Sequence, residues 1–490
     1  MTEIHTTYGR VRGRVEDGLH VFRGIPFAAP PVGTRRFAAP EPPEPWADIL
    51  DATAFGPVPP QSAMSVAGPD APRPVDDGRG WLTANVWSAD VDGRRPVMVW
   101  IYGGAYRAGS SAEPGYEGTV LAREHGVVVV TFNHRVGVEG YGQIEGAPAN
   151  RGLLDQVAAL EWVRDNAAAV GGDPAQVTVF GESAGAGAVA SLLAMPRAVG
   201  LFRRAIAQSV PGTFFSADLA ADVMITIAAG LDRRATVDDL RDVDPDELAT
   251  AADRLRMREH LDRWGVVALT PTPFSPVVDG DVLPTTPWRA LREGAAADVE
   301  LIVGHNRDEF RLFLALAGVL GTVTPGMAEG TLTAFAPDAD AFRAAYPDAS
   351  DEKLVELVQS DWLFRMPSLR LAQEHQGRSH VYELTLEAPG RGGVLGACHG
   401  LDVPLVFGTA GGALGTMLLG AEPGPEVEAA SAAMRAAWTG FARGEGPGWP
   451  AWSEAREAWV VDARPVVGTY PEETSAALWA GHEFAPLPLT

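Results

Sequence analysis

A serine between two glycines is the feature of this sequence that most directly indicates chemistry. Ser183 is the centre of Gly181-Glu-Ser-Ala-Gly185, which follows an apolar run at 177–180 and precedes a stretch of small residues. Glycines two positions before and after a serine permit a tight turn from a strand into a helix, which exposes the hydroxyl and aims the helix N-terminus at it. The chain has 55 glycines, so the motif alone carries little weight. Its place between a strand and a helix predicts that Ser183 is a nucleophile.

Attack by a serine on an acyl group places negative charge on a carbonyl oxygen, and backbone N–H groups must then receive that charge. Tyr102-Gly-Gly-Ala105 follows a predicted strand upstream of the serine, where such a loop belongs. Its small residues allow the backbone to approach a substrate closely. We therefore expect the N–H groups of Gly104, Ala105 and Ala184 to form an oxyanion hole, and Gly103 to contact the substrate.

The general base that a serine nucleophile requires should be a histidine late in the chain. The later histidines are His260, His305, His375, His380, His399 and His482. His399 lies in a loop of small residues beyond a predicted strand, which is the placement that a base needs. His380 opens a strand, His375 lies in a polar run that we expect to be solvated, and His482 is in a loop near the C-terminus. The pattern therefore favours His399.

The acid that orients the base should lie between the serine and the histidine in the chain. The apolar run at 301–304 is followed by His305-Asn-Arg-Asp-Glu309, so Asp308 and Glu309 are both candidates. Spacing does not choose between them, because adjacent side chains point in different directions. We expect the one that is not the acid to form an ion pair or a helix cap, with Arg307 as its partner.

Composition indicates a globular protein and excludes several kinds of partner. Of the 490 residues, 46% are hydrophobic and 21% are charged, and the formal net charge is -24. Such an acidic chain is a poor ligand for nucleic acid or for an anionic membrane. Cys398 is the one cysteine, so no intrachain disulfide is expected. The sequence contains neither a signal-like apolar core at its start nor a membrane-length apolar run, so we expect a cytoplasmic protein, with secretion after removal of a leader as the alternative. The oligomeric state is left open, with a monomer as one option.

The segments that would position these residues alternate between strands and helices. Buried strands are predicted at 96–102, 127–132, 177–180, 300–304, 380–386 and, as the last one, 457–461, with helices at 152–170 and 184–195. This alternation predicts an α/β fold in which residues 1–490 form a single domain. A β-hairpin is expected at about 7–24, around Asp17-Gly18, and helical insertions that shape a pocket are expected at about 217–263 and 312–366. The stretches 61–80 and 408–420 are expected to be loops.

Many further motifs give the chain a resemblance to one family. In chain order they are Phe22-Arg-Gly-Ile-Pro-Phe-Ala-Ala-Pro-Pro-Val-Gly33, Ala84-Asn-Val-Trp87, Trp100-Ile-Tyr-Gly-Gly104, Phe132-Asn-His-Arg-Val-Gly137, Asn150-Arg-Gly-Leu-Leu-Asp-Gln156, Gly171-Gly-Asp-Pro174, Pro276-Val-Val-Asp-Gly280 and His399-Gly-Leu-Asp-Val-Pro404. With the serine motif, they make the chain resemble the type B carboxylesterases, which include cholinesterases and bacterial p-nitrobenzyl esterases. The resemblance implies an α/β-hydrolase fold with a large, mostly parallel central sheet, helices on both faces and helical insertions around the pocket. It also implies that the acid is Glu309, the glutamate of the family's Asn-Lys/Arg-Asp-Glu motif.

Three positions depart from the family pattern. Phe310 replaces the glycine that usually follows the acid and is expected to crowd the wall near it. Ala105 replaces the third glycine of the oxyanion loop, and Trp81 stands where many members have a disulfide cysteine. The last change is consistent with a bacterial, disulfide-free relative. The catalytic set is intact, which speaks against the non-catalytic branch of the family.

Together these features predict a serine carboxylesterase that cleaves small neutral alkyl or aryl esters through an acyl-enzyme, with no metal or organic cofactor. Glu182 either adds negative potential near the imidazolium or makes a structural hydrogen bond, and the second is favoured. The alternative is a narrow-specificity esterase for one aromatic diester or toxin ester, and a non-catalytic binding protein of the same fold is the least favoured reading. The aromatic residues that we expect to line the pocket are Tyr106, Phe313, Trp362, Phe364 and Phe407.

Overall fold

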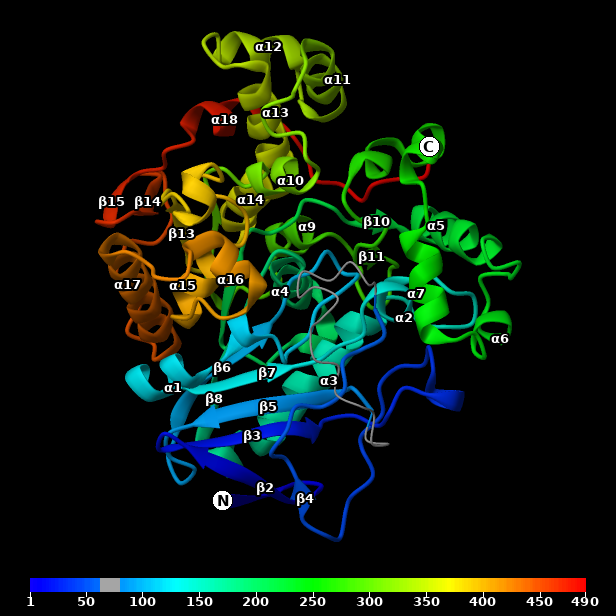
Figure 1. Ribbon diagram of the computed structural model, residues 1–490, viewed down its shortest axis with the longest axis vertical. Coiled ribbons are helices and arrows are strands. Elements are labelled where there is room, and N and C mark those ends of the chain that lie inside the picture. The colour runs from blue at the N-terminus through cyan, green and yellow to red at the C-terminus, as the bar shows by residue number, and fades with distance from the viewer. Residues whose placement is uncertain (62–79) are drawn as a thin grey trace.

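The computed structural model describes residues 1–61 and 80–490, and its centre is one large sheet (Figure 1). Within the described residues the sheet has 13 strands in the order β1-β2-β3-β5-β7-β6-β8-β9-β12-β13-β14-β15, with β4 paired to β2. The strand bounds, including those of the separate pair β10 and β11, are β1 (Thr2–Thr6), β2 (Gly9–Glu16), β3 (Leu19–Pro26), β4 (Leu50–Asp51), β5 (Thr83–Ser88), β6 (Arg95–Ile101), β7 (Val128–Phe132), β8 (Gly172–Glu182), β9 (Arg204–Gln208), β10 (Phe215–Ser216), β11 (Val277–Val278), β12 (Glu300–Asn306), β13 (Ser379–Leu384), β14 (Glu457–Val461) and β15 (Val466–Thr469). Neighbours are parallel from β7 to β14, and antiparallel from β1 to β7 and from β14 to β15.

Helices surround this sheet (Figure 1). Their bounds are α1 (Thr119–His125), α2 (Gly137–Tyr141), α3 (Arg151–Asn166), α4 (Ala184–Ala194), α5 (Ala217–Ala229), α6 (Val237–Leu240), α7 (Pro245–Asp253), α8 (Leu261–Trp264), α9 (Pro287–Arg292), α10 (Arg311–Leu316), α11 (Pro325–Phe335), α12 (Ala339–Ala345), α13 (Asp351–Ser360), α14 (Met366–Glu374), α15 (Asp402–Phe407), α16 (Gly412–Leu419), α17 (Pro425–Ala442) and α18 (Glu473–Leu478). A π-helix, η7 (Asp361–Arg365), joins α13 to α14 without a break. None of the described helices is both long and apolar enough to cross a membrane.

The central strand β6 shows why an unbroken apolar run forms the middle of the sheet. Val97, Val99 and Ile101 belong to one hydrophobic cluster, and Met98 and Trp100 belong to a second cluster. Successive side chains of a strand point to opposite faces, so the two clusters lie on the two faces of the sheet. Buried residues of α3 and α4 extend the first cluster, and those of α1, α15 and α17 extend the second. Both faces are therefore covered by helices, as in a parallel sheet of an α/β protein.

The structure differs from the sequence expectations near the C-terminus. β15 follows β14, so the prediction that 457–461 is the last strand is wrong; β15 is a short edge strand whose residues are mostly exposed, so it lacks the apolar run of a buried strand. The stretch 408–420 contains α16, so the loop prediction is wrong there. Its leucines pack on the core, and Leu418 has no exposed surface. β5 and β9 were not among the predicted strands, and the loop predicted at 61–80 lies almost wholly outside the described residues.

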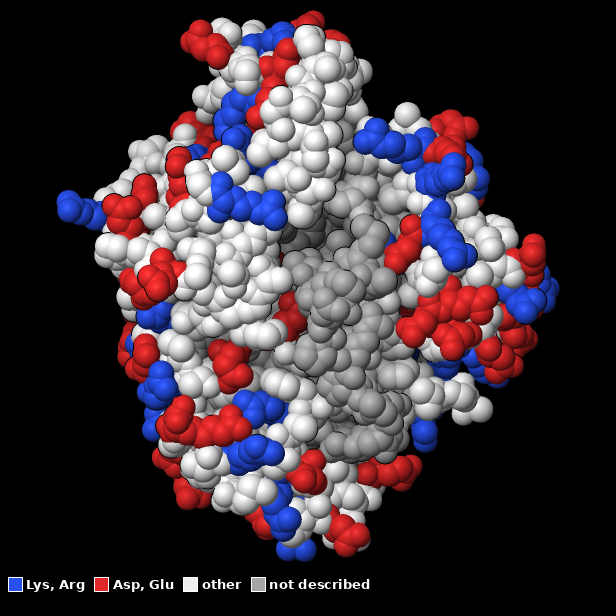
Figure 2. Space-filling view, in the orientation of Figure 1, with Lys and Arg blue, Asp and Glu red and all other residues white. Residues whose placement is uncertain are grey.

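Several peripheral features complete the description of the fold. α11, α12 and α13 project at the top of the molecule in Figure 1, and η7 leads the chain from α13 back inward. On the face shown in Figure 2, acidic residues gather over α6 and α7, whereas the surface over α16 is uncharged. At the N-terminus, β2 and β3 pair antiparallel across Asp17-Gly18. The stretches 217–263 and 312–366 contain the helices α5 to α8 and α10 to η7.

Candidate active site

Ser183 occupies a sharp turn between β8 and α4. Its φ of 58° and ψ of -125° lie outside the regions that a residue with a side chain usually adopts, so the turn is strained. The N–H of Ser183 donates to the carbonyl of Gln208 at 2.9 Å, and its carbonyl accepts from the N–H of Gly187 at 2.9 Å. Gly185 lies so close to Ile101 that a Cβ atom would overlap the carbonyl oxygen there. Contacts on both sides therefore hold the turn, and the serine stays partly exposed.

His399 lies within hydrogen-bond distance of both Ser183 and Glu309. Its Nε2 is 2.9 Å from Oγ of Ser183, and its Nδ1 is 2.6 Å from Oε2 of Glu309. Its backbone N–H also donates to the carbonyl of Glu309 at 3.3 Å. Glu309 has no exposed surface, and His399 is 6% exposed. The serine follows β8 and the acid follows β12, so the carboxyl edge of the parallel sheet brings together residues that are distant in the sequence.

Two residues that the sequence reasoning missed hold the carboxylate of Glu309. The hydroxyl of Ser209 donates to Oε1 at 2.5 Å, and the backbone N–H of Asn306 donates to the same oxygen at 2.8 Å. The side-chain amide of Asn306 also donates to the carbonyl of Cys398 at 2.8 Å, which ties the acid to the segment of the histidine. Ser209 directly follows β9. A polar residue at the end of a buried strand is the signal that could have found it.

Cations, and not the imidazole, engage Asp308. Its Oδ1 accepts from Nζ of Lys353 at 2.9 Å, and its Oδ2 accepts from the guanidinium of Arg307 at 3.2 Å. Burial alone would raise the pKa of Asp308, but Lys353 and Arg307 outweigh burial and hold that pKa well below its ordinary value. The contacts of the two acidic candidates therefore differ: Glu309 meets the imidazole, and Asp308 is a buried ion-pair residue.

Carboxylates surround the imidazole and favour its protonated form. Oε1 of Glu182 lies 3.1 Å from Nε2 of His399, and within the described residues that oxygen makes no hydrogen bond. Burial alone would lower the pKa of His399, but Glu182 and then Glu309 outweigh burial and raise it to about 9. Burial also raises the pKa of Glu182 to about 8. The effect of Glu182 is therefore electrostatic, and the structural hydrogen bond favoured from the sequence is absent at this oxygen.

The loop that follows β6 is braced by its own backbone and by a distant threonine. The carbonyl of Gly104 accepts from the N–H of Ala108 at 3.1 Å, and the carbonyl of Ala105 accepts from the hydroxyl of Thr272 at 2.8 Å. Gly104 has a φ of 121°, and a Cβ atom there would overlap the carbonyl oxygen of Ala108. Glycine is therefore required at this position, because no other residue adopts this conformation readily or fits the space.

Gly103 and Ala184 lie beside the serine. A Cβ atom on Gly103 would be 3.1 Å from Cβ of Ser183, so only glycine leaves open space there. Ala184 is the first residue of α4, where the N–H has no partner within the helix. In the described chain, the N–H groups of Gly104, Ala105 and Ala184 donate to no protein acceptor, so they are free to bind a substrate oxygen.

Two aromatic residues expected at the pocket lie against the imidazole of His399. Phe364, on η7, stacks on the ring with 4.2 Å between centroids and 25° between planes. Phe313, on α10, is tilted against the same ring at 5.2 Å. These rings cover the imidazole with apolar surface and limit its rotation. Phe310, the departure from the family pattern, packs on Phe313 at 5.1 Å between centroids.

The other three aromatic residues make their ring contacts away from the imidazole. Phe407 has no exposed surface and packs on Trp100 with 5.0 Å between ring centroids, so the prediction that it lines the pocket is wrong. It is the last residue of α15, and that helix contributes its side chains to the second hydrophobic cluster. Trp362 is 8% exposed, and Tyr106 is 3% exposed and packs on Tyr141.

His375 is buried, so the expectation that it is solvated is wrong. Its Nδ1 is 2.8 Å from Oγ of Ser379, and its Nε2 is 3.0 Å from the carbonyl of Ala296. His380 also contacts the backbone, with Nδ1 3.0 Å from the carbonyl of Trp449. His375 is therefore buried together with polar partners, although the sequence around it is polar.

Comparison with known proteins gives the family. A sequence profile of the carboxylesterase family matches residues 1–322. This chain belongs to the carboxylesterase family. The para-nitrobenzyl esterase of Bacillus subtilis is 37% identical over 96% of this chain and 96% of its own length. The fumonisin B1 esterase of Sphingopyxis macrogoltabida is 36% identical over 89% of this chain and 81% of its own.

A solved structure extends the comparison to the fold. The crystal structure of a carboxylesterase from Geobacillus stearothermophilus superposes with a TM-score of 0.85 at 34% identity, and the match covers 98% of this chain and 100% of that one. The α/β-hydrolase fold implied by the resemblance is therefore confirmed. Ester hydrolysis is the reaction class that this family membership supports.

Proposed function

We propose that this chain is a serine carboxylesterase with Ser183 as the nucleophile, His399 as the general base and Glu309 as the acid that orients the base. The observation that carries the proposal is the continuous series of contacts from Oγ of Ser183 through the imidazole to Glu309, at 2.9 and 2.6 Å. The hydroxyl attacks an ester carbonyl while the imidazole takes its proton, and the carboxylate stabilises the imidazolium. The imidazolium gives that proton to the leaving alcohol. Water then cleaves the acyl-enzyme by the same proton transfers.

The N–H groups of Gly104, Ala105 and Ala184 are proposed to receive the charge that develops on the carbonyl oxygen. Their backbone is fixed before substrate binds, so little reorganisation accompanies the reaction. Loss of one such donor typically raises the barrier by about 3–4 kcal/mol. The proposed steps use protein groups and water alone.

Small neutral alkyl or aryl esters are the substrates that the surroundings of His399 favour. Phe313 and Phe364 lie against the imidazole, and Leu414 of the uncharged helix α16 lies 3.6 Å from where a Cβ atom of Gly400 would be. Apolar surface on two sides binds hydrocarbon better than charge. An anionic group would also lie close to the carboxyl group of Glu182, whose ionised form repels it.

A narrow-specificity esterase for one aromatic diester or toxin ester is the second candidate. It is favoured by the 36% identity to a relative named fumonisin B1 esterase. Both candidates use the same residues, so a panel of alkyl, aryl, diester and toxin esters separates them. A high kcat/KM for one complex ester, with little turnover of simple ones, would favour the second candidate.

The mechanism is tested with Ser183→Ala and a fluorophosphonate. We expect the wild-type chain to hydrolyse p-nitrophenyl acetate and butyrate, to lose this activity after fluorophosphonate treatment, and to carry the label on the peptide of Ser183. Ser191→Ala is the matched control, because Ser191 is a buried serine of α4, the helix that follows Ser183, and its hydroxyl donates to a backbone carbonyl at 2.7 Å. It should retain both activity and labelling. Activity that survives Ser183→Ala, or a label elsewhere in the wild type, would refute the mechanism.

A further inference from the structure

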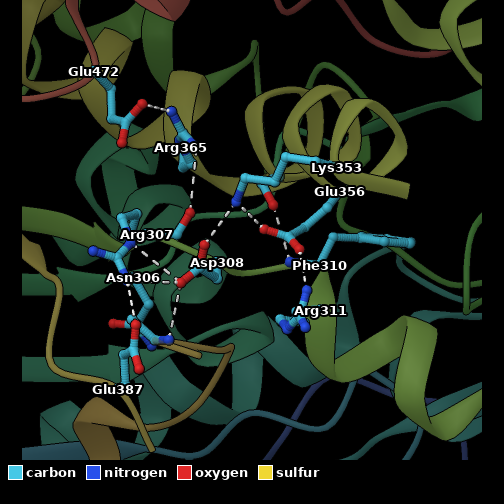
Figure 3. Close-up of polar contacts among 12 residues, drawn as sticks. Asn306, Arg307, Asp308, Phe310, Arg311, Lys353, Glu356, Arg365, Glu387 and Glu472 are labelled. Carbon is cyan, nitrogen blue, oxygen red and sulfur yellow. Dashed lines mark hydrogen bonds and ion pairs between the residues drawn. The ribbon is translucent and has the colours of Figure 1, made fainter. Parts of the chain in front are cut away.

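The continuous helix formed by α13 and η7 contacts the segment that carries the proposed acid, residues 306–311, which we term the acid segment. The hydroxyl oxygen of Ser360 accepts from the backbone N–H of Phe310 at 3.0 Å. The guanidinium of Arg365 donates to the carbonyl of Arg307 at 3.2 Å (Figure 3). Two contacts, five residues apart on the helix, therefore attach it to the acid segment.

The same helix reaches residues 394–399, which we term the base segment. Phe364 stacks on the ring of His399. Asp308 joins the base segment to the acid segment, because its N–H donates to the carbonyl of Ala397 at 2.9 Å and its Oδ2 accepts from the N–H of Ala397 at 3.1 Å. The separation of the two segments therefore depends on Asp308 and on the group that holds its side chain.

Lys353, in the first turn of α13, holds that side chain (Figure 3). Its Nζ donates to Oδ1 of Asp308 at 2.9 Å and also pairs with Glu356. Glu356 accepts from Nη1 of Arg311 at 2.8 Å, and Nε of Arg311 donates to the carbonyl of Val394 at 2.5 Å. One ammonium group is therefore connected to the acid segment directly and to the base segment by two routes.

The ammonium of Lys353 contacts both carboxylates, and each carboxylate also contacts one arginine, Arg307 for Asp308 and Arg311 for Glu356. The side chain of Asp308 is 8% exposed and that of Glu356 is 1% exposed, so two poorly hydrated carboxylates share one cation. Burial alone would lower the pKa of Lys353, but Glu356 and Asp308 outweigh burial and raise it above its ordinary value, so the amine stays protonated. Without the ammonium, the two carboxylates would lie close together in a medium that screens their repulsion weakly.

Lysine at this position contrasts with the rest of the chain. Lysine and arginine together number 39, and Lys353 is the only lysine among them. An ammonium donates from one point in three directions, which suits two carboxylates on different elements. A guanidinium is a planar fork that suits one carboxylate in a bidentate pair. The geometry of Asp308 and Glu356 therefore matches the residue type that this chain uses nowhere else.

We propose that Lys353 is a positioning residue that keeps the acid and base segments at the separation needed for the hydrogen bond between Glu309 and His399. This inference rests on the proposed function, because it concerns the rate of that reaction. Lys353 acts through Asp308 and is not assigned any contact with substrate. Misplacing a catalytic group by about 1 Å lowers a rate on the order of 100-fold. Loss of the ammonium should therefore lower kcat and leave KM nearly unchanged.

The test compares variants at Lys353 with a matched control in the same group of helices, α11 to α13. For Lys353→Met we expect kcat for p-nitrophenyl butyrate, per serine titrated with fluorophosphonate, to fall about 10- to 100-fold with little change in KM. Lys353→Arg should restore part of kcat, because it keeps a cation near both carboxylates although its planar fork suits only one of them. The control is Arg343→Met. In the wild type this guanidinium pairs at 3.2 Å with Glu329, an exposed residue of α11, so kcat of the variant should match the wild type.

A second variant covers the case in which Lys353→Met does not fold. Glu356→Gln is nearly isosteric and weakens the same network, so it should also lower kcat without raising KM. A wild-type kcat in folded Lys353→Met would overturn the proposal. If Lys353→Met does not fold, a wild-type kcat in Glu356→Gln would overturn it. The proposal also fails if the loss of activity is confined to a change in KM or to a smaller number of titratable serines. Ser183→Ala separates the two proposals. If Ser183→Ala is active, the serine mechanism is refuted. If Ser183→Ala is inactive and Lys353→Met keeps full activity, only the positioning role is refuted.

Discussion

Replacing Glu182 by glutamine should extend activity to lower pH. The proposed base must be neutral to accept the serine proton, so activity is lost as the pH falls through the pKa of His399. The carboxylate of Glu182 favours the imidazolium, and the pKa of His399 is raised to about 9 with Glu182 as the largest raising influence. Removing that negative charge should lower this pKa and move the acidic limb of the pH–rate profile downward.

The distance between the two groups gives the size of the shift. Oε1 of Glu182 and Nε2 of His399 are 3.1 Å apart, and the two side chains are 9% and 8% exposed. Unit charges at this distance attract by about 1.3 kcal/mol in water and by about 5 kcal/mol at an effective dielectric constant of about 20. Because one pKa unit corresponds to about 1.4 kcal/mol, the shift should be about one to four units. Burial raises the pKa of Glu182 itself to about 8, so it is mostly protonated at neutral pH and the lower part of this range is expected.

The assay is kcat/KM for p-nitrophenyl acetate across the pH range, since this quantity reports the ionisation of the free enzyme. The wild-type midpoint should lie above the ordinary histidine pKa of about 6.5, and that of Glu182→Gln at least about one unit below the wild-type midpoint. Glu383→Gln is the control, because Glu383 is fully buried and its burial already raises its pKa well above the ordinary value. It should leave the midpoint in place. A midpoint for Glu182→Gln that is unmoved or raised would contradict the reasoning.

Four further substitutions test other parts of the structure. Glu309→Gln should lower kcat by about 10⁴-fold, because an amide does not hold the imidazole in the required tautomer. A larger loss of kcat in Asp308→Asn would reverse the assignment of the acid. Asp308→Asn should lower kcat by less than Glu309→Gln does, because it acts only through the separation of the acid and base segments. It should also lower the free energy of unfolding at pH 7, and because the pKa of Asp308 is held well below its ordinary value, this loss should shrink as the pH of urea titrations falls below about 4. Gly104→Ala should lower kcat/KM by about 100-fold or more, because a side chain there displaces the proposed oxyanion donors. Unchanged kinetics would exclude the loop as the source of the oxyanion hole. Arg135→Met should lower the free energy of unfolding by about 3–5 kcal/mol, since it leaves Asp155 buried without its ion-pair partner, and a change below about 1 kcal/mol in urea unfolding would contradict this estimate.

Some of the site could be predicted from short stretches of sequence, because the features concerned are local. The turn at Ser183 depends on glycines two residues away, and the loop at Gly104 depends on small residues after a strand. The strand at 96–102 was recognisable because both of its faces are buried, which requires an unbroken apolar run. The α/β fold class followed from the order of such runs. The choice of Glu309 over Asp308 already lay beyond local pattern and came from family resemblance, since the two are adjacent in the sequence.

The contacts around these residues were decided by the tertiary structure alone. Ser209 donates to Glu309 across 100 positions of the chain, because strand order places β9 beside β12. Lys353 meets Asp308 only because α13 folds back over the acid segment. Phe407 has the same aromatic character as Phe364, yet Phe407 packs on Trp100 and Phe364 packs on the imidazole. Local spacing specifies which backbone conformation a segment prefers. The contacts named above depend instead on how distant segments pack against each other. Residues so far apart in the sequence form no local pattern from which the packing could be predicted.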